Sequence, residues 1–169
     1  MPCRLSLLLC LFVLAACDSG EPNRLSLGDY ESGEGEAVVR HMLKNLPVID
    51  PEVPKVYTVV KGPNLQSTSM PFVRRMEDTK VTFISGEVLT MREPDKSIID
   101  PRSGLSPVTL QLHEIKGTGT DSWEVIAGWA YKKTYERYRY KLIKKADAYE
   151  VTETSRLEGN YVKPSAETK

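Results

Sequence analysis

The chain has 169 residues and a mass of 19.0 kDa, is 40% hydrophobic and 27% charged, and carries 23 basic and 23 acidic side chains. This composition disfavours the disordered, collagen-like and polytopic membrane classes and is typical of one modest globular domain. The even charge balance points to no global electrostatic partner.

The first residues of the chain predict an exported protein. A short basic start that includes Arg4 precedes a 12-residue apolar run from Leu5 to Ala16, and Cys17 follows it. At 1.5 Å per residue this run reaches only about 18 Å, well short of the roughly 30 Å hydrocarbon core of a bilayer. Residues 1–16 are therefore interpreted as a signal peptide.

The end of this segment, Leu14-Ala15-Ala16-Cys17, resembles the lipobox of bacterial lipoproteins. The resemblance implies cleavage before Cys17 and acylation of its thiol with several chains, enough for stable membrane anchoring. Asp18 is similar to the aspartate that favours inner-membrane retention in enteric lipoproteins. The expected location is the bacterial envelope, facing the periplasm, at the inner rather than the outer membrane. The alternative is an ordinary cleaved secretory signal with an incidental cysteine.

Cleavage before Cys17 would remove the other two cysteines, Cys3 and Cys10, and leave no free thiol. Disulfides, thiol catalysis and thiolate metal sites would then be excluded. The mature chain would hold 22 basic and 23 acidic side chains, a formal charge of −1. Residues 17–33 are rich in acidic residues and glycine, which predicts a lipidated cysteine followed by a flexible tether.

A single folded domain is expected over 34–154, and it opens with a helix over 34–46. Four apolar residues of this segment follow the i, i+3, i+4, i+7 spacing and precede Pro47: Val39, Met42, Leu43 and Leu46. After a proline-rich connection, the apolar run 56–60 predicts a strand that is covered on both faces. A second, short helix is expected over 70–77, with Ser69 as its N-cap and Pro71 in its first turn.

From residue 80 onward apolar residues alternate with smaller or polar ones, which predicts antiparallel strands. They are expected around 81–83, 108–112, 123–131, 138–142 and 149–154, with turns at 117–121, 133–134 and 146–147. Residues 94–107 are expected to be irregular, and 155–169 to form a polar tail. This order predicts an α+β fold, with the N-terminal helix and the short second helix packed on a curved antiparallel sheet of about five or six strands.

Two further stretches carry a resemblance to a known family. Tyr138-Arg139-Tyr140-Lys141-Leu142 followed by residues 145–151 looks like a closing hairpin, and residues 100–104 form an Asp-Pro-x-Ser-Gly loop. With the element order over 36–154, these features resemble the nuclear transport factor 2-like (cystatin-like) superfamily, in particular an uncharacterised bacterial group. The resemblance implies a cone-shaped α+β domain. It implies no activity, because the superfamily holds enzymes and non-catalytic partners alike and none of its catalytic motifs matches here.

The sequence predicts no catalytic residue, no metal site and no cofactor. Its two histidines, His41 and His113, lie outside any HExxH pattern and are expected to be ordinary surface side chains. Ser103 lacks the glycines of a nucleophile elbow. Asp78 or Asp121 could act as a general base only if buried beside a pocket, and turn or capping roles are expected instead.

The most distinctive stretch is 131–145, which holds seven basic residues, one acidic residue and four interleaved tyrosines. In a strand, Arg137, Arg139 and Lys141 share one face, and with Lys132 and Lys133 they form a candidate binding face. Bases beside aromatic rings suit single-stranded nucleic acid, but export argues against that partner. Anionic lipid headgroups, an acidic protein partner and a merely solvated strand face stay open as interpretations.

Four aromatic residues are candidates to line a pocket inside the cone: Tyr57, Phe83, Trp123 and Trp129. The alternative is that they form the core, as large aromatic side chains usually do.

The resulting hypothesis is a lipid-anchored, non-catalytic envelope lipoprotein that acts as a binding or accessory module. Its expected partners are the membrane, through the anchor, and an envelope protein or another anionic surface, but not nucleic acid. Two alternatives stay open. One is a pocket that binds or processes a small molecule, and the other is an inhibitor or immunity lipoprotein directed at a secreted toxin.

Overall fold

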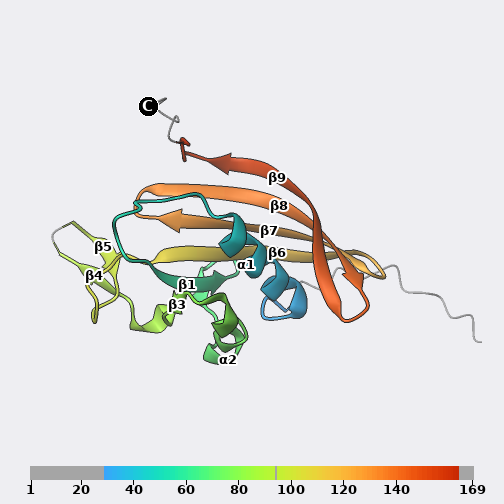
Figure 1. Ribbon diagram of the computed structural model, residues 1–169, viewed down its shortest axis with the longest axis horizontal. Coiled ribbons are helices and arrows are strands. Elements are labelled where there is room, and N and C mark those ends of the chain that lie inside the picture. Colours follow the sequence, from blue (N-terminus) through green and yellow to red (C-terminus); the bar gives the residue numbers. More distant parts are fainter. Residues whose placement is uncertain (1–28, 94, 164–169) are drawn as a thin grey trace, which may run out of the picture.

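A computed structural model describes residues 29–93 and 95–163 as an α+β fold built on one main sheet (Figure 1). The strands of this sheet are β1 (Val56–Lys61), β2 (Gln66–Ser67), β3 (Thr82–Phe83), β6 (Val108–Gly119), β7 (Ser122–Tyr131), β8 (Thr134–Lys145) and β9 (Ala148–Gly159). They follow the order β2-β1-β6-β7-β8-β9, and β3 pairs with β1. Helix α1 (Gly33–Asn45) packs on one face, called the inner face below. The predicted helix on a curved open sheet is confirmed.

The sheet differs from the prediction in one respect, because it is mixed rather than wholly antiparallel. β1 runs parallel to β6, with Val59 opposite Leu110, and also parallel to β3. Parallel strands are usually covered on both faces. Val59 and Val60, which point to opposite faces of β1, are only 1% and 7% exposed. The predicted strand with two covered faces is thus confirmed.

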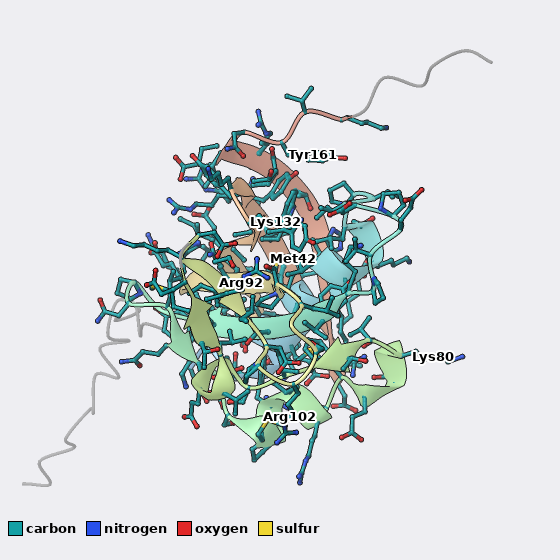
Figure 2. The ribbon with its side chains drawn as sticks, turned by 90° about the vertical axis from the view of Figure 1, so that its left-hand side faces the viewer. Met42, Lys80, Arg92, Arg102, Lys132 and Tyr161 are labelled. Atoms are coloured by element: carbon teal, nitrogen blue, oxygen red, sulfur yellow. The ribbon has the colours of Figure 1, made fainter. Side chains whose placement is uncertain are left out.

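The helix α1 lies within one residue of its predicted bounds. Its apolar residues turn toward the inner face, where Val38, Val39 and Met42 enter the core. Figure 2 shows Met42 among the central side chains, whereas Lys80 extends away from the body of the molecule. The helix ends before Pro47, as expected from the restriction that proline places on the preceding backbone.

The second predicted helix is shorter than expected. α2 (Met70–Arg74) is followed by the 3₁₀ turn η1 (Glu77–Thr79) instead of continuing to residue 77. Ser69 is its N-cap, as predicted, and its hydroxyl accepts a hydrogen bond from the Phe72 amide at 3.3 Å. Phe72 is 1% exposed and anchors this short element to the core.

Strands β6 to β9 form an antiparallel meander with short turns. The turn between β7 and β8 falls at Lys132 and Lys133, one residue earlier than predicted, and Lys132 adopts a left-handed conformation (φ 54°). β9 carries two bulges, at Thr152 and Leu157, where the pairing with β8 shifts by one residue.

The predicted polar tail begins too early. β9 continues to Gly159, and the Tyr161 ring packs on Trp129 with the two ring centroids 5.5 Å apart. Arg156 and Glu136 form a two-pronged ion pair at 2.7 and 2.9 Å in the same region. Residues 155–161 therefore belong to the fold, because β9, Asn160 and Tyr161 have partners on β7, β8 or the turn between them.

The segment expected to be irregular contains a separate hairpin. β4 (Thr90–Arg92) pairs with β5 (Ser97–Ile99), and Met91 stands opposite Ile98. The loop that follows is closed by Asp100, which is 4% exposed and accepts hydrogen bonds from the Ser103 hydroxyl at 2.6 Å and the Arg102 amide at 3.2 Å. The Ser103 hydroxyl, with smaller contributions from backbone amides, holds the pKa of Asp100 below its ordinary value.

The end of the predicted tether is folded. The Tyr30 hydroxyl donates to the carbonyl of His113 at 3.1 Å, and the Glu31 carboxylate accepts from Lys61 at 2.5 Å. Residues 29–33 thus belong to the domain. The predicted signal peptide, Cys17, Asp18 and the rest of the tether lie outside the described residues.

Candidate functional site

The three central bases of the candidate binding face share the outer face of β8, as predicted, but each is paired. Their partners are carboxylates of β7 and β9: Arg137 with Glu158 at 2.6 Å, Arg139 with Glu124 at 3.2 Å, and Lys141 with Glu153 at 2.7 Å. These half-exposed pairs each contribute at most about 1 kcal/mol to stability. Their larger effect is to neutralise this part of the face.

The two other candidate residues lie at the β7–β8 turn. Lys132 is 3.1 Å from the Asp50 carboxylate, and this hydrogen bond raises the pKa of Lys132 above its ordinary value. Lys133 is exposed and has no ion-pair partner among the described residues. The turn therefore keeps more of its positive charge than the strand face does.

The four aromatic candidates do not share a cavity. All four lie in or against the core: Tyr57 beside Phe83 with centroids 6.2 Å apart, Trp123 beside Tyr149 at 5.2 Å, and Trp129 beside Tyr161 at 5.5 Å. Trp129 is only 2% exposed. These four residues therefore belong to the core, which was the alternative interpretation. Among the described residues, no pocket opens beside them because α1 covers the inner face.

Both histidines are half-buried rather than fully exposed on the surface. The His41 ring lies edge-on to Tyr140, with centroids 5.7 Å apart, and burial lowers its pKa. His113 points away from the core, as predicted, and its Nε2 is buried with no hydrogen-bond partner among the described residues. Burial, and then the nearby Arg137 guanidinium, hold the pKa of His113 below its ordinary value, so the ring is neutral at pH 7.

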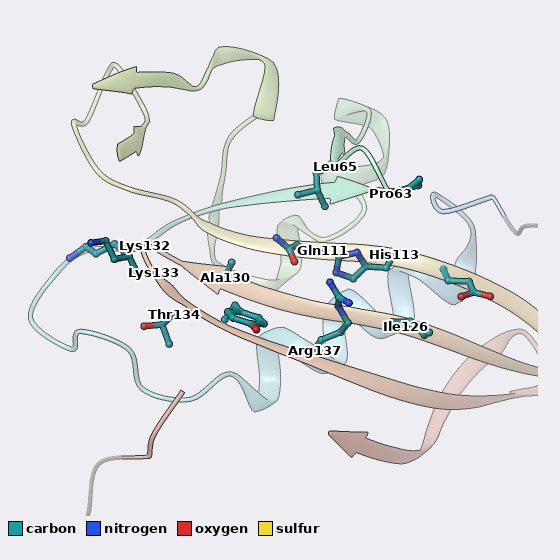
Figure 3. Close-up of a pocket in the computed structure, with 12 residues that line it drawn as sticks. Pro63, Leu65, Gln111, His113, Ile126, Ala130, Lys132, Lys133, Thr134 and Arg137 are labelled. Carbon is teal, nitrogen blue, oxygen red and sulfur yellow. The ribbon is translucent and has the colours of Figure 1, made fainter. Parts of the chain in front are cut away.

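His113 lines a hollow on the outer face that the sequence did not predict (Figure 3). This sheet hollow has a volume of about 660 Å³. Gln111 and His113 project into it from β6 and Arg137 from β8, while Pro63 and Leu65 form one side. On β7, the two outward-facing residues Gly128 and Ala130 are small. This is the one feature of the sequence that could have indicated a hollow here.

A second hollow of about 660 Å³ adjoins the first beneath the β4–β5 hairpin. This hairpin hollow is lined by Arg92, Asp95, Lys96 and Ile98 of the hairpin region, among others. The two hollows share Ala130, the turn residues Lys132 and Lys133, and Thr134 at the start of β8, so they form one continuous trough. Of the candidate binding face, the trough brings together Lys132, Lys133 and Arg137, but not Arg139 or Lys141.

Neither of the two candidate general bases is a buried carboxylate. Asp78 is an exposed ion-pair partner of Arg40 at 2.8 Å, and Asp121 is exposed in a turn. Within residues 29–93 and 95–163, no three His, Cys, Asp or Glu side chains are grouped as metal ligands. In the same part of the chain, no helix has the length and apolar character needed to span a bilayer.

Comparison with known proteins finds no matching family model, no matching curated protein and no matching solved structure.

Proposed function

We propose that this chain is a lipid-anchored, non-catalytic binding module of a bacterial envelope, held at the membrane through Cys17 and facing the periplasm. The observation that carries the proposal is Leu14-Ala15-Ala16-Cys17 at the end of a 12-residue apolar run. A cysteine in this context accepts lipid, and several acyl chains give stable anchoring. Asp18 favours the inner membrane.

The fold is compatible with such an anchor. The first described residue is Asp29, and 11 residues separate it from Cys17. A chain of this length reaches at most about 40 Å when fully extended. The domain would therefore stay close to the membrane surface, within reach of other envelope proteins.

The trough supports binding as the activity of the domain. It presents hydrogen-bond donors and cations on an open face formed by the main sheet and the β4–β5 hairpin. The small-molecule alternative depended on Tyr57, Phe83, Trp123 and Trp129, which lie in or against the core instead. An inhibitor or immunity lipoprotein would be one particular case of the proposed binding module.

Labelling in living bacteria tests the anchor. Cells that express the full chain are fed an alkyne analogue of palmitate, and membranes are separated from soluble periplasm. The wild-type chain should carry the label and sediment with the inner membrane, whereas Cys17→Ser should lose both properties. Cys10→Ser is the matched control and should behave as wild type. Equal labelling of Cys17→Ser and wild type would refute the lipid anchor.

Cross-linking in the same cells tests the binding module. The wild-type chain should cross-link to a stoichiometric envelope partner, and the cross-link should weaken in Cys17→Ser because the local concentration at the membrane is lost. A wild-type chain that is anchored and yet cross-links to no protein would refute the binding role.

A further inference from the structure

The trough carries an excess of positive charge. Five cations line it, and only two carboxylates: Arg92, Lys96, Lys132, Lys133 and Arg137 against Asp95 and Glu114. Three of the cations are paired, Arg92 with Asp95 at 2.6 Å, Lys132 with Asp50 at 3.1 Å and Arg137 with Glu158 at 2.6 Å. Among the described residues, Lys96 and Lys133 lie within ion-pair distance of no carboxylate. These two ammonium groups are left to bind an anionic ligand.

The walls of the trough add neutral hydrogen-bonding groups. The Gln111 amide and the His113 ring reach into it from β6, and the Thr134 hydroxyl from β8. His113 Nε2 is covered by protein in the described part of the chain, so Gln111 and Thr134 are the neutral groups that a ligand would meet. A peptide segment can form hydrogen bonds with these side chains through its backbone amides and carbonyls.

Apolar side chains stand at the sides of the trough. Leu65 lines the sheet hollow and is 43% exposed, and Ile98 lines the hairpin hollow and is 46% exposed. Met91, opposite Ile98 on the hairpin, is 57% exposed. Exposed apolar side chains of this kind can pack against an apolar side chain of another protein.

The trough lies away from the part of the domain where the described chain begins. Gly33, the first residue of α1, lies against Tyr149, whose ring packs on Trp123 near the start of β7. Lys132 follows the last residue of β7, so the lysine turn is at the other end of a 10-residue strand, about 30 Å away. Figure 1 shows the β4–β5 hairpin at one end of the sheet and the start of α1 well away from it.

We propose that the trough binds an acidic, extended segment of a partner protein. Carboxylates of the segment pair with Lys96 and Lys133, its backbone bonds to Gln111 and Thr134, and an apolar side chain packs against Leu65 or Ile98. The choice of a protein over anionic lipid rests on the proposed function, in which the anchored module binds another envelope protein.

Binding of poly-L-glutamate tests the charge recognition. The purified full chain, in detergent, is titrated into a fluorescent poly-L-glutamate probe, and the dissociation constant is read from anisotropy. The double variant Lys96→Glu/Lys133→Glu should bind about tenfold more weakly or worse, and binding should weaken as salt is raised. Lys44→Glu makes the same kind of charge change on an exposed residue of α1 and should bind like wild type. Equal affinities for the double variant and wild type would overturn the proposal.

Two further experiments distinguish a protein partner from a lipid surface, and the trough from the anchor. Vesicles of phosphatidylcholine and phosphatidylglycerol should bind the anchor-free Cys17→Ser chain no better than vesicles of phosphatidylcholine alone. Binding that needs phosphatidylglycerol and Lys133, without binding of poly-L-glutamate, would overturn the proposal in favour of a lipid surface. Cys17→Ser should bind poly-L-glutamate as tightly as wild type. If the lipid anchor is wrong, the labelling experiment fails while poly-L-glutamate still binds. If the trough proposal is wrong, poly-L-glutamate binding fails while the labelling is unchanged.

Discussion

Replacing Arg156 by alanine should destabilise the domain by leaving the Glu136 carboxylate buried without its main donors. Glu136 is 3% exposed and accepts Arg156 Nε at 2.7 Å and Nη2 at 2.9 Å. Hydrogen bonds to charged groups contribute about 1.5–3 kcal/mol. The Arg156 side chain is 52% exposed, which reduces this value, and the Tyr161 amide still donates to Glu136 at 3.1 Å. A loss of about 2 kcal/mol in the free energy of unfolding is expected.

Urea unfolding followed by tryptophan fluorescence measures this loss. Arg137→Ala is the matched control, because its ion pair with Glu158 lies between two half-exposed side chains, and it should cost less than about 1 kcal/mol. The double variant Glu136→Met/Arg156→Met should be more stable than Arg156→Ala, since it leaves no buried charge. The reasoning is refuted if Arg156→Ala unfolds at the same urea concentration as Arg137→Ala.

The same pair gives a pH dependence with a defined sign. Arg156 holds the pKa of Glu136 below its ordinary value of 4.5, against the opposing effect of burial. In the wild-type chain this contribution to stability is complete above about pH 4.5 and is lost as the pH falls through the folded-state pKa. In Arg156→Ala the effect of burial remains, so the carboxyl protonates at higher pH. The stability difference between the two proteins should be largest at neutral pH and shrink below about pH 4.

Two further substitutions test the construction of the outer face. A Cβ at Gly128 would lie 2.2 Å from the carbonyl oxygen of Glu136, so Gly128→Ala should push β7 and β8 apart and lower the free energy of unfolding by about 1–3 kcal/mol in a urea titration. Asp100→Ala should free the loop that closes the β4–β5 hairpin, and limited proteolysis should then cut near residue 102 much faster than in wild type, whereas cleavage elsewhere is unchanged.

The local elements could be predicted from the sequence because single-segment patterns determine them. Val39 and Met42 repeat at helical spacing and Pro47 ends the pattern, and α1 was predicted to within one residue at each end. The apolar run 56–60 was correctly assigned to a doubly covered strand. Its parallel pairing with β6 could not be predicted, because nothing local says which strand lies beside it 50 residues later in the chain.

At the polar end of the chain, the sequence predicted a tail where the structure has a strand. Residues 155–159 carry the composition of a tail, yet Arg156 pairs with Glu136 of β8 and continues the strand. A polar edge strand is stabilised by the backbone and side chains of its neighbour rather than by its own apolar residues. Its end therefore depends on a partner that composition alone does not reveal.

The candidate site was predicted only in part for the same reason. The two-residue period of a strand correctly placed Arg137, Arg139 and Lys141 on one face. Their neutralising carboxylates come from β7 and β9, and the register needed to bring Glu124 or Glu158 opposite them is a property of the sheet. The trough depends further on a hairpin that the sequence did not predict.

The outermost strand also affects how these molecules behave when crowded. A strand of 12 residues at the border of a sheet is a template onto which another chain can polymerise. In β9 the bulges at Thr152 and Leu157 leave only residues 153–156 in regular register between them, fewer than the five or six of an average strand. Even at high protein concentration, β9 should resist growing into fibrils.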